Sequence, residues 1–239
     1  MVARLFKSSR IAVLLVSAGF AWFGHAVSAI AQEFPASINR TSSRFVIARL
    51  KYPGGSDWYN GPSEEPNMLK FLAKNTNIDV DPRYVWVDVA SNDIFNYPFL
   101  YMTGHGRVDF TETEVKRLRA YCDAGGFIYI NDDYGLDTTI RPELKKVFPE
   151  QNLVELPFSY GLYHCHFDFP NGLPKIEEHD GKPAQGLGLF DNGRLCVFYA
   201  YQSDPTDGWD DEDVNELPES KRLEGLQIGA NIIIWALEH

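Results

Sequence analysis

Short apolar segments that alternate with helical patterns constrain the fold of this chain most strongly. Five segments have the β-branched and aromatic composition of buried strands: residues 45–50, 84–89, 98–102, 127–130 and 195–201. Strands that alternate with helices form parallel βαβ units, which place helices on both faces of one sheet. The pattern therefore predicts an α/β sandwich with three layers, α/β/α, around a mostly parallel sheet.

The helices are marked by their periodicity and by their ends. Thr111 and Glu114 have the spacing of a capping box, and Gly125 follows the same helix as a left-handed cap. The four predicted helices cover residues 64–75, about 112–124, 141–148 and 221–237. The last helix is apolar nearly all round, which predicts burial. Residues 157–190 are rich in Pro, Gly and aromatic residues, and we expect them to cover a site or to add an edge hairpin.

The N-terminus has the three parts of a secretory signal peptide. Arg4, Lys7 and Arg10 precede an apolar run at 11–23, and residues 29–31 form an Ala-x-Ala cleavage site. We therefore expect residues 1–31 to be a signal peptide, 32–43 a linker and 44–239 a single α/β domain. An uncleaved membrane anchor is the alternative. After cleavage no membrane span is expected, and the protein would be periplasmic or extracellular.

The net charge limits the classes of partner that the chain could bind, and the cysteine spacing limits the kinds of metal site. The formal net charge is −11, and removing residues 1–31 takes away three of 22 basic and none of 33 acidic residues, which gives 19 − 33 = −14. Such an acidic chain does not favour nucleic acid or an anionic membrane surface. Cys122, Cys165 and Cys196 have no C-x-x-C spacing, which excludes a zinc ribbon. One disulfide with a free thiol, or three buried thiols, both remain open.

Four of the predicted strands run directly into clusters of polar residues and glycines. In open α/β sheets, ligands bind in the crevice beyond the carboxyl ends of the strands. We therefore expect the residues at these four strand ends to line a ligand-binding crevice. They are Asp57, Trp58 and Tyr59 after the first strand, His105 after the third, Asp132 and Asp133 after the fourth, and Asp204 and Asp207 after the last.

Several of these motifs resemble known families. PFLYMTGHG, the helix ending in LRAYCDAGG and the strand FIYINDD are similar to class I glutamine amidotransferase-like domains. That resemblance implies a flavodoxin-like sheet. GGSDWYN, TGHG, DDYG and SDPTDGW, in this order, resemble the exported bacterial family called domain of unknown function 4159, over residues 44–238. The resemblance implies a fold and a compartment rather than an activity. Larger members contain von Willebrand factor A-like regions, which implies protein partners in the envelope.

The chain departs from true amidotransferases at the nucleophile. Their chemistry needs a cysteine on a sharp turn between glycines, and none of the three cysteines has such neighbours. The nearest match to G-x-S-x-G surrounds Ser159, but Pro157 replaces its first glycine. The sequence therefore argues against glutaminase or esterase chemistry by this route.

Each residue at the strand ends has two interpretations. Histidine is a common general base, so His105 suits a site, yet its flanking glycines also suit a simple turn. Asp132 and Asp133 point to opposite faces, so we expect one to cap the next segment and only the other to reach the crevice. Trp58 and Tyr59 suit a flat ligand such as a sugar ring or a nucleobase, or else pack in a satellite core.

Two segments raise the question of metal binding. In a strand, His164, His166 and Asp168 would face one side and could hold zinc or iron, with His179 or Asp204 completing the ligand set. A His-x-His pair is also common by chance. The acidic loop at 203–214 fails the EF-hand pattern, because Pro205 and Val214 occupy ligand positions. A solvated acidic face is its default interpretation.

These features favour a ligand-binding or accessory module of the cell envelope, whose ligand would be a small polar molecule or a glycan. The alternative is a hydrolase that acts on a glycan or another polar substrate with His and Asp residues, with or without a metal. A structural partner in an envelope assembly is the third hypothesis.

Overall fold

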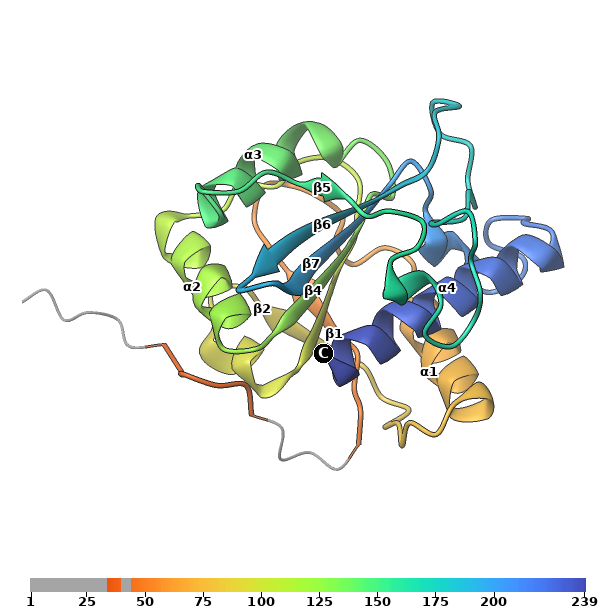
Figure 1. The fold of residues 1–239 in the computed structure, drawn as a ribbon, viewed down its shortest axis with the longest axis horizontal. Helices are drawn as coiled ribbons and strands as arrows, with labels where there is room; N and C mark the ends of the chain where they lie inside the picture. The colour runs from red at the N-terminus through yellow and green to blue at the C-terminus, as the bar shows by residue number, and fades with distance from the viewer. Residues whose placement is uncertain (1–33, 40–43) are drawn as a thin grey trace, which may run out of the picture. The chain divides into compact units, whose positions relative to one another are not determined.

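The computed structural model describes residues 34–39 and 44–239. The predicted signal peptide and half of the predicted linker lie outside the described residues. The described part is an α/β fold with a seven-stranded sheet and four α-helices (Figure 1). None of its helices has both the length and the apolar character needed to cross a membrane.

The elements alternate along the chain as the sequence predicts, with two extra strands. The strands are β1 (Ala48–Lys51), β2 (Val85–Asp88), β3 (Phe99–Met102), β4 (Phe127–Asn131), β5 (Val154–Glu155), β6 (Gln185–Asp191) and β7 (Arg194–Tyr201). The α-helices are α1 (Glu64–Asn75), α2 (Glu112–Asp123), α3 (Asp137–Val147) and α4 (Glu219–Glu238). Three short 3₁₀ helices are η1 (Asn92–Asn96), η2 (Gly161–Tyr163) and η3 (Pro205–Gly208).

The sheet has the strand order β2-β1-β3-β4-β7-β6-β5. The first five strands in this order are parallel to their neighbours, whereas β6 and β5 run antiparallel. β6 and β7 form a hairpin whose turn residues, Asn192 and Gly193, both have positive φ. The edge hairpin expected from the segment 157–190 is therefore formed by its last residues.

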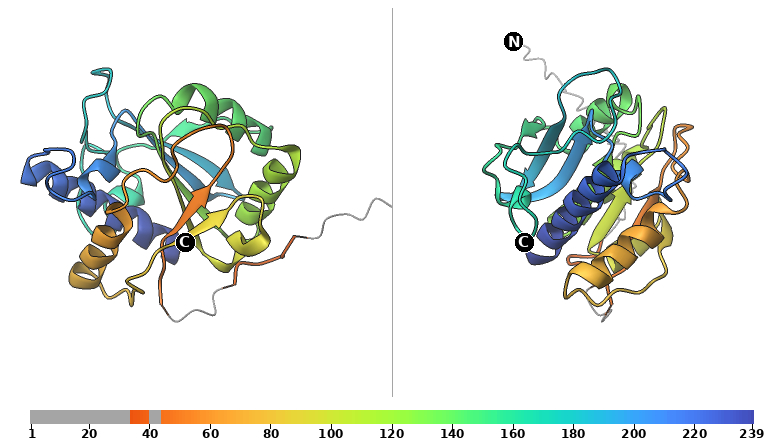
Figure 2. Two further views of the ribbon diagram at one scale, coloured as in Figure 1. Left: turned by 180° about the vertical axis from the view of Figure 1, so that it is seen from behind. Right: turned by 90° about the vertical axis from the view of Figure 1, so that its right-hand side faces the viewer.

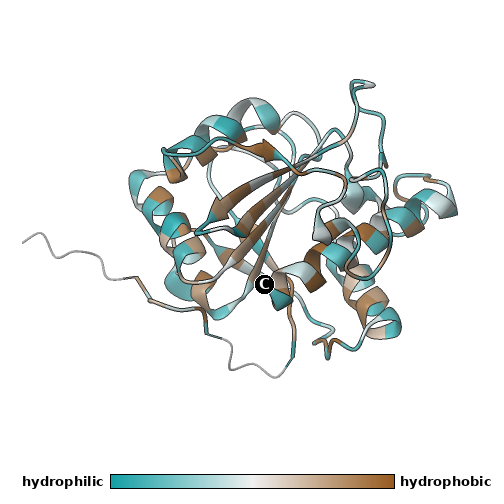
Figure 3. Ribbon diagram, viewed as in Figure 1, coloured by the Kyte–Doolittle hydropathy of each residue, from teal (hydrophilic) through white to brown (hydrophobic). Residues whose placement is uncertain are grey.

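Side chains of the buried strands alternate between two apolar clusters, which lie on opposite faces of the sheet. In β3, Leu100 and Met102 belong to one cluster, and Phe99 and Tyr101 belong to the other. Helices α2 and α3 pack against the first cluster, and α1 and α4 against the second (Figures 1 and 2). The helices have apolar and hydrophilic sides (Figure 3). Burial on both faces explains why these strands read as nearly continuous apolar runs.

Local signals set the helix ends. The capping box of α2 forms as predicted: the Thr111 hydroxyl accepts from the Glu114 N–H at 3.3 Å, and the Glu114 carboxylate accepts from the Thr111 N–H at 2.7 Å. Helix α1 has the predicted bounds. Helix α3 begins at Asp137 rather than at 141, because the Asp132 carboxylate accepts the Leu136 N–H at 2.8 Å and fixes the turn before the helix.

Helix α4 packs against the loop after β7 and so fixes the position of this loop. A Cβ on Gly225 would lie 2.6 Å from the Pro205 carbonyl oxygen, so only glycine permits this approach of η3 to the helix. Trp209 is fully buried beside the same helix and donates its indole N–H to the Gly225 carbonyl at 2.9 Å. The close packing at Gly225 thus fixes the segment that carries Asp204 and Asp207.

Candidate functional site

The carboxyl ends of four parallel strands bring five of the predicted site residues together. Asp57 follows β1, His105 follows β3, Asp133 follows β4, and Asp204 and Asp207 follow β7. Four of them line a cavity of about 670 Å³. The other lining residues come from the loop before α1 and the start of α1, from the loop after β4, from the loop at 177–179 and from the acidic loop. They are Asn60, Gly61, Pro62, Ser63, Glu64, Tyr134, Glu177, His179, Asp210, Asp211, Val214 and Asn215.

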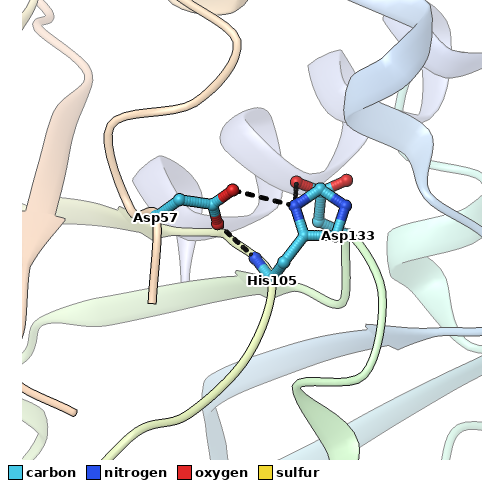
Figure 4. Close-up of side chains that lie close together, drawn as sticks. All are labelled: Asp57, His105 and Asp133. Carbon is cyan, nitrogen blue, oxygen red and sulfur yellow. Dashed lines mark hydrogen bonds and ion pairs between the residues drawn. The ribbon is translucent and has the colours of Figure 1, made fainter. Parts of the chain in front are cut away.

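Two carboxylates hold the His105 imidazole by one nitrogen (Figure 4). Its Nδ1 lies 3.1 Å from Asp57 Oδ2 and 3.1 Å from Asp133 Oδ2. Asp57 also accepts the His105 backbone N–H at 2.5 Å through its other oxygen, so it clamps the residue at two points. The His105 side chain is 47% exposed. Because both carboxylates engage Nδ1, Nε2 remains available to a ligand or to water.

Hydrogen bonds of Tyr52 connect the two loops that carry Asp57 and His105. Tyr52 donates its hydroxyl to the Thr103 carbonyl at 2.8 Å and lies 2.7 Å from the Ser56 hydroxyl. Gly104 has φ +139°, and a Cβ there would lie 2.5 Å from Ser56 Oγ. The glycine before His105 is therefore required by this close approach of the two loops.

Asp204 is buried at the centre of a hydrogen-bond network. Its Oδ1 accepts from the Asn131 amide at 2.7 Å and from the Thr206 hydroxyl at 3.2 Å. Its Oδ2 lies 3.6 Å from His179 Nε2. The residue has left-handed backbone angles (φ 49°, ψ 63°), which turn its side chain back under the loop that begins η3.

Asp207 and Asp210 share one amide from the acidic loop. Asn215 donates to Asp207 Oδ1 at 3.0 Å and to Asp210 Oδ2 at 3.2 Å. The Ser63 hydroxyl donates to Asp210 Oδ1 at 2.6 Å and so connects the loop to the start of α1. The acidic loop is therefore folded onto the cavity wall at Asp207 and Asp210, whereas Asp211, Glu212 and Asp213 are exposed.

The carboxylates of the cavity raise one another's proton affinity. Burial, followed by the negative charges of Asp204 and Asp133, raises the pKa of Asp207 to about 9. Burial and the charge of Asp133 also raise the pKa of Asp204 well above its usual range. Burial likewise raises the pKa of Asp210. Burial and neighbouring negative charges both disfavour the ionised form of a carboxyl group, so this region favours a cation or a proton.

Two groups of three side chains have the spacing needed to hold a metal ion. The first is Asp57, His105 and Asp133, and the second is Asp133, Asp204 and Asp207. Within each group the ligand atoms lie within 4.8 Å of one another. Asp133 belongs to both groups and therefore connects the imidazole to the buried carboxylates.

The structure separates three other predicted residues from the cavity. Asp132 points to the opposite face, where it accepts from Leu136 N–H at 2.8 Å and from the Tyr199 hydroxyl at 3.2 Å. This matches the expectation that only one of the two adjacent aspartates reaches the crevice. Trp58 and Tyr59 contact each other edge to face, and Trp58 also contacts Trp86, so these rings form a cluster beside the cavity. Tyr59 is exposed and Trp58 is partly buried.

The expected strand geometry of His164, His166 and Asp168 is wrong. Residues 161–163 form the 3₁₀ helix η2, and the following turn sends the two imidazoles to different partners. His164 pairs with Asp168 at 2.5 Å and with the Phe158 carbonyl at 2.8 Å, whereas His166 pairs with the Asn75 carbonyl at 2.9 Å. Neither histidine belongs to the groups with metal-ligand spacing found in the described part of the chain. The expectation assumed a strand over residues 164–168, whereas this segment is irregular and contains turns.

The comparison with known proteins agrees with the motif order seen in the sequence. Residues 46–237 match the model of the family described as domain of unknown function DUF4159. The chain belongs to this family. No curated protein matches the chain significantly. The DUF4159 match contains all seven strands and every residue of the cavity, so the site is built entirely within the family's domain.

The cysteines of this DUF4159 domain do not contribute a nucleophile to the cavity. All three are free thiols; Cys122 and Cys196 are buried, and Cys165 is partly exposed. Burial raises the pKa of the Cys165 thiol to about 11, which keeps it protonated near neutral pH. The interpretation of three thiols agrees with the structure, except that Cys165 is only partly buried.

Sequence reasoning missed the supporting residues of the site. Asn131 lies at the end of β4 and Asn60 and Asn215 lie in loops, and each donates to a cavity aspartate. Single asparagines in polar loops carry no pattern that distinguishes them from turn residues. His179 was considered only as a further ligand for His164 and His166, whereas it lies against Asp204.

Proposed function

We propose that the DUF4159 domain is a hydrolase whose catalytic centre is the cavity at His105. The observation that carries this proposal is the clamp on Nδ1 by Asp57 and Asp133, at 3.1 Å each, which leaves Nε2 free. A carboxylate that accepts the Nδ1 hydrogen bond orients an imidazole and stabilises its protonated form. This is the arrangement of a general base.

In this mechanism, His105 Nε2 takes a proton from a water molecule as the water oxygen attacks the acyl carbon of an ester or amide. Asp57 and Asp133 stabilise the imidazolium that forms. The imidazolium then returns the proton to the leaving group as the bond to that group breaks. A base placed in this way contributes about 10²–10⁴-fold to the rate of hydrolysis.

The charge of the cavity indicates the substrate class. Its walls carry the carboxyl groups of Asp133, Asp204, Asp207 and Asp210, and its lining has no lysine or arginine among the described residues. Anionic substrates are therefore disfavoured by repulsion, and a neutral or positively charged polar substrate is favoured. The exposed ring of Tyr59 beside the cavity suits an apolar sugar face, so a glycan that carries ester or amide groups fits this class.

The test is hydrolysis of p-nitrophenyl acetate and of acetylated chitin and xylan oligosaccharides. We expect His105→Gln to lower kcat/KM about 100-fold or more with little change in the melting temperature. His164→Gln changes a histidine outside the cavity and serves as the matched control, with activity retained. Turnover that is equal in wild type and in His105→Gln would refute the proposal.

The second candidate is a ligand-binding or accessory module without catalysis, a function in which envelope protein partners are also proposed. One observation favours this function. Ser63, the serine that lines the cavity, donates its hydroxyl hydrogen bond to Asp210 and so does not act as a nucleophile. Binding of the same oligosaccharides without hydrolysis, measured by calorimetry, would support this function over the hydrolase.

We also propose that the protein is exported and that its fold is a three-layer, flavodoxin-like sandwich. The strand order β2-β1-β3-β4-β7 of the parallel strands supports the fold, because it follows the 2-1-3-4-5 pattern of flavodoxin-like sheets. Export is supported by the charge, the apolar run and the cleavage site of residues 1–31. A mature protein that begins at Gln32 by mass spectrometry is the expected result.

A further inference from the structure

The geometry points to a divalent-cation site formed by Asp133, Asp204 and Asp207. One carboxylate oxygen from each residue lies within 4.8 Å of the other two, at the bottom of the cavity. This inference goes beyond the proposed hydrolysis, because a cation bound by these three residues does not depend on a catalytic role of His105.

The positive charge needed to balance these three carboxylates is not supplied by the surrounding residues. In the described part of the chain, their only ion pairs are with imidazoles: His105 Nδ1 at 3.1 Å from Asp133, and His179 Nε2 at 3.6 Å from Asp204. Asp207 has an amide, Asn215, as its hydrogen-bond partner. Three converging carboxylates with so little positive charge repel one another unless a cation or protons lie between them.

Each carboxylate is held in place by one oxygen only. Asp133 Oδ2 accepts from Asn60 and lies 3.1 Å from His105 Nδ1. Asp204 Oδ1 accepts from Asn131 and Thr206, and Asp207 Oδ1 accepts from Asn215. The second oxygen of each residue receives no hydrogen bond from an amide or a hydroxyl group of the described chain. Neutral donors on one oxygen orient a carboxylate and leave the other oxygen for a metal, as outer partners do in metal sites.

An independent observation comes from His179, which lines the same cavity. Its side chain is only 4% exposed, and its Nδ1 is buried with no hydrogen-bond partner in the described structure. Buried polar nitrogens in proteins are nearly always paired with protein or with ordered water. The cavity therefore suits a ligand that brings further polar groups, and a hydrated cation does so through its water molecules.

The donor set indicates which cations fit. Carboxylate oxygens without thiolates select hard ions such as Ca²⁺, Mg²⁺ and Mn²⁺. Three carboxylates that converge without a phosphate from a substrate resemble a Ca²⁺ site more closely than a Mg²⁺ site, because Mg²⁺ sites usually contain one or two carboxylates.

The test is calorimetric titration of the EDTA-treated, dialysed protein with CaCl₂, and with MgCl₂ for comparison. We expect one Ca²⁺ per chain, and we expect Asp207→Asn to weaken binding at least about tenfold, the loss that even outer partners of a metal cause. Asp213→Asn removes the same charge from an exposed position of the same loop and should leave the affinity unchanged. Circular dichroism at the titration temperature verifies that each variant is folded.

The histidine variants separate this inference from the proposed function. We expect His105→Gln to weaken Ca²⁺ binding less than Asp207→Asn does, whether or not hydrolysis is lost, because His105 contacts only one of the three carboxylates. Loss of Ca²⁺ binding in His105→Gln with retention in Asp207→Asn would overturn the site, because the ion would then lie between Asp57, His105 and Asp133. No binding of either ion to the folded wild type, or equal affinity in Asp207→Asn, would also overturn it.

Discussion

Two groups of buried or partly buried carboxylates lie in this domain, and only one contains the side chain of an arginine or lysine. In the arginine cluster, Arg49 of β1 pairs with Glu64 and Glu65 at the start of α1, and the Tyr101 hydroxyl donates to Glu64 at 2.5 Å. In the carboxylate cluster, Asp133, Asp204 and Asp207 converge with imidazoles as their only ion-pair partners in the described structure. Glu64 contributes to both regions, because it also lines the cavity.

This difference in positive charge shows which cluster has its carboxylates balanced by a residue of the chain itself. Arg49 is 1% exposed and uses all three guanidinium nitrogens, which contact both glutamates and the carbonyl oxygens of Trp58, Asn60 and Gly61. Burial raises the pKa of Glu64 and of Glu65, and the positive charge of Arg49 is the largest opposing influence. No comparable charge opposes the raised pKa of Asp207. The charge of the arginine cluster is therefore balanced within the chain, whereas the carboxylate cluster lacks a balancing charge, as the proposed cation site requires.

The largest expected effect follows from removing the cation of the arginine cluster. Arg49→Met leaves two buried carboxylates without their partner, and we expect the free energy of unfolding to fall by about 3–5 kcal/mol. The measurement is urea denaturation followed by circular dichroism. Arg83→Met, which breaks an exposed pair with Asp81, is the control and should change stability little.

A double variant decides whether charge or packing causes the loss. Arg49→Met combined with Glu65→Gln removes one of the stranded charges, and it should recover part of the stability lost in Arg49→Met. A double variant that is less stable than Arg49→Met would instead assign the loss to packing of the guanidinium between Tyr101 and α1.

A smaller effect is expected at the contact between α4 and η3, the short helix that contains Asp207. In Gly225→Ala, the new Cβ would lie 2.6 Å from the Pro205 carbonyl oxygen and 3.0 Å from Gly208 Cα. Overpacking costs about 1–3 kcal/mol, and alanine returns about 1 kcal/mol of helix propensity, so we expect a net loss of up to about 2 kcal/mol. Thermal denaturation measures it. Ser220→Ala, at an exposed position of α4, is the control.

The same variant tests whether the two clusters are independent. Displacement of η3 should weaken Ca²⁺ binding in Gly225→Ala, because η3 contains Asp207. The arginine cluster is built on β1 and α1, which Gly225 does not contact at short range. Unchanged affinity together with a loss of stability would show that η3 is not needed to position the carboxylates.

The sequence predicted the carboxylate cluster better than the arginine cluster, for a physical reason. Residues that follow parallel strands meet at one edge of the sheet whatever the details of their loops, so Asp57, His105, Asp133 and Asp207 could be placed together from strand ends alone. Arg49 lies inside an apolar strand, and its burial depends on two glutamates 15 and 16 residues away that fold beneath it. No local pattern indicates such a pairing.

The second half of the chain, which is less regular, was predicted less well from the sequence. β6 was not predicted because glycines at 186 and 188 weaken its strand pattern; these glycines are needed because a Cβ would meet Tyr163 and Leu195. The Asn192-Gly193 turn was the available signal for the hairpin. The metal prediction at His164 and His166 failed because it assumed a strand where η2 and a turn lie.

The smallest effect, taken per pH unit, is expected from a pH dependence that distinguishes the carboxylate cluster from the rest of the domain. With EDTA present, the raised pKa of Asp207, about 9, means that the folded protein holds this proton more tightly than the unfolded chain, whose aspartates titrate near 3.9. The stability that this proton contributes is complete below about pH 4 and is lost as pH rises toward 9. Asp207→Asn mimics the protonated side chain, so its advantage over wild type should grow between pH 5 and pH 8, by at most about 1.4 kcal/mol per pH unit. Urea denaturation at the two pH values measures this difference, with Asp213→Asn as the control. A constant difference between wild type and Asp207→Asn would mean that the positive charge missing from this cluster is already supplied within the chain, as Arg49 supplies it to the glutamates.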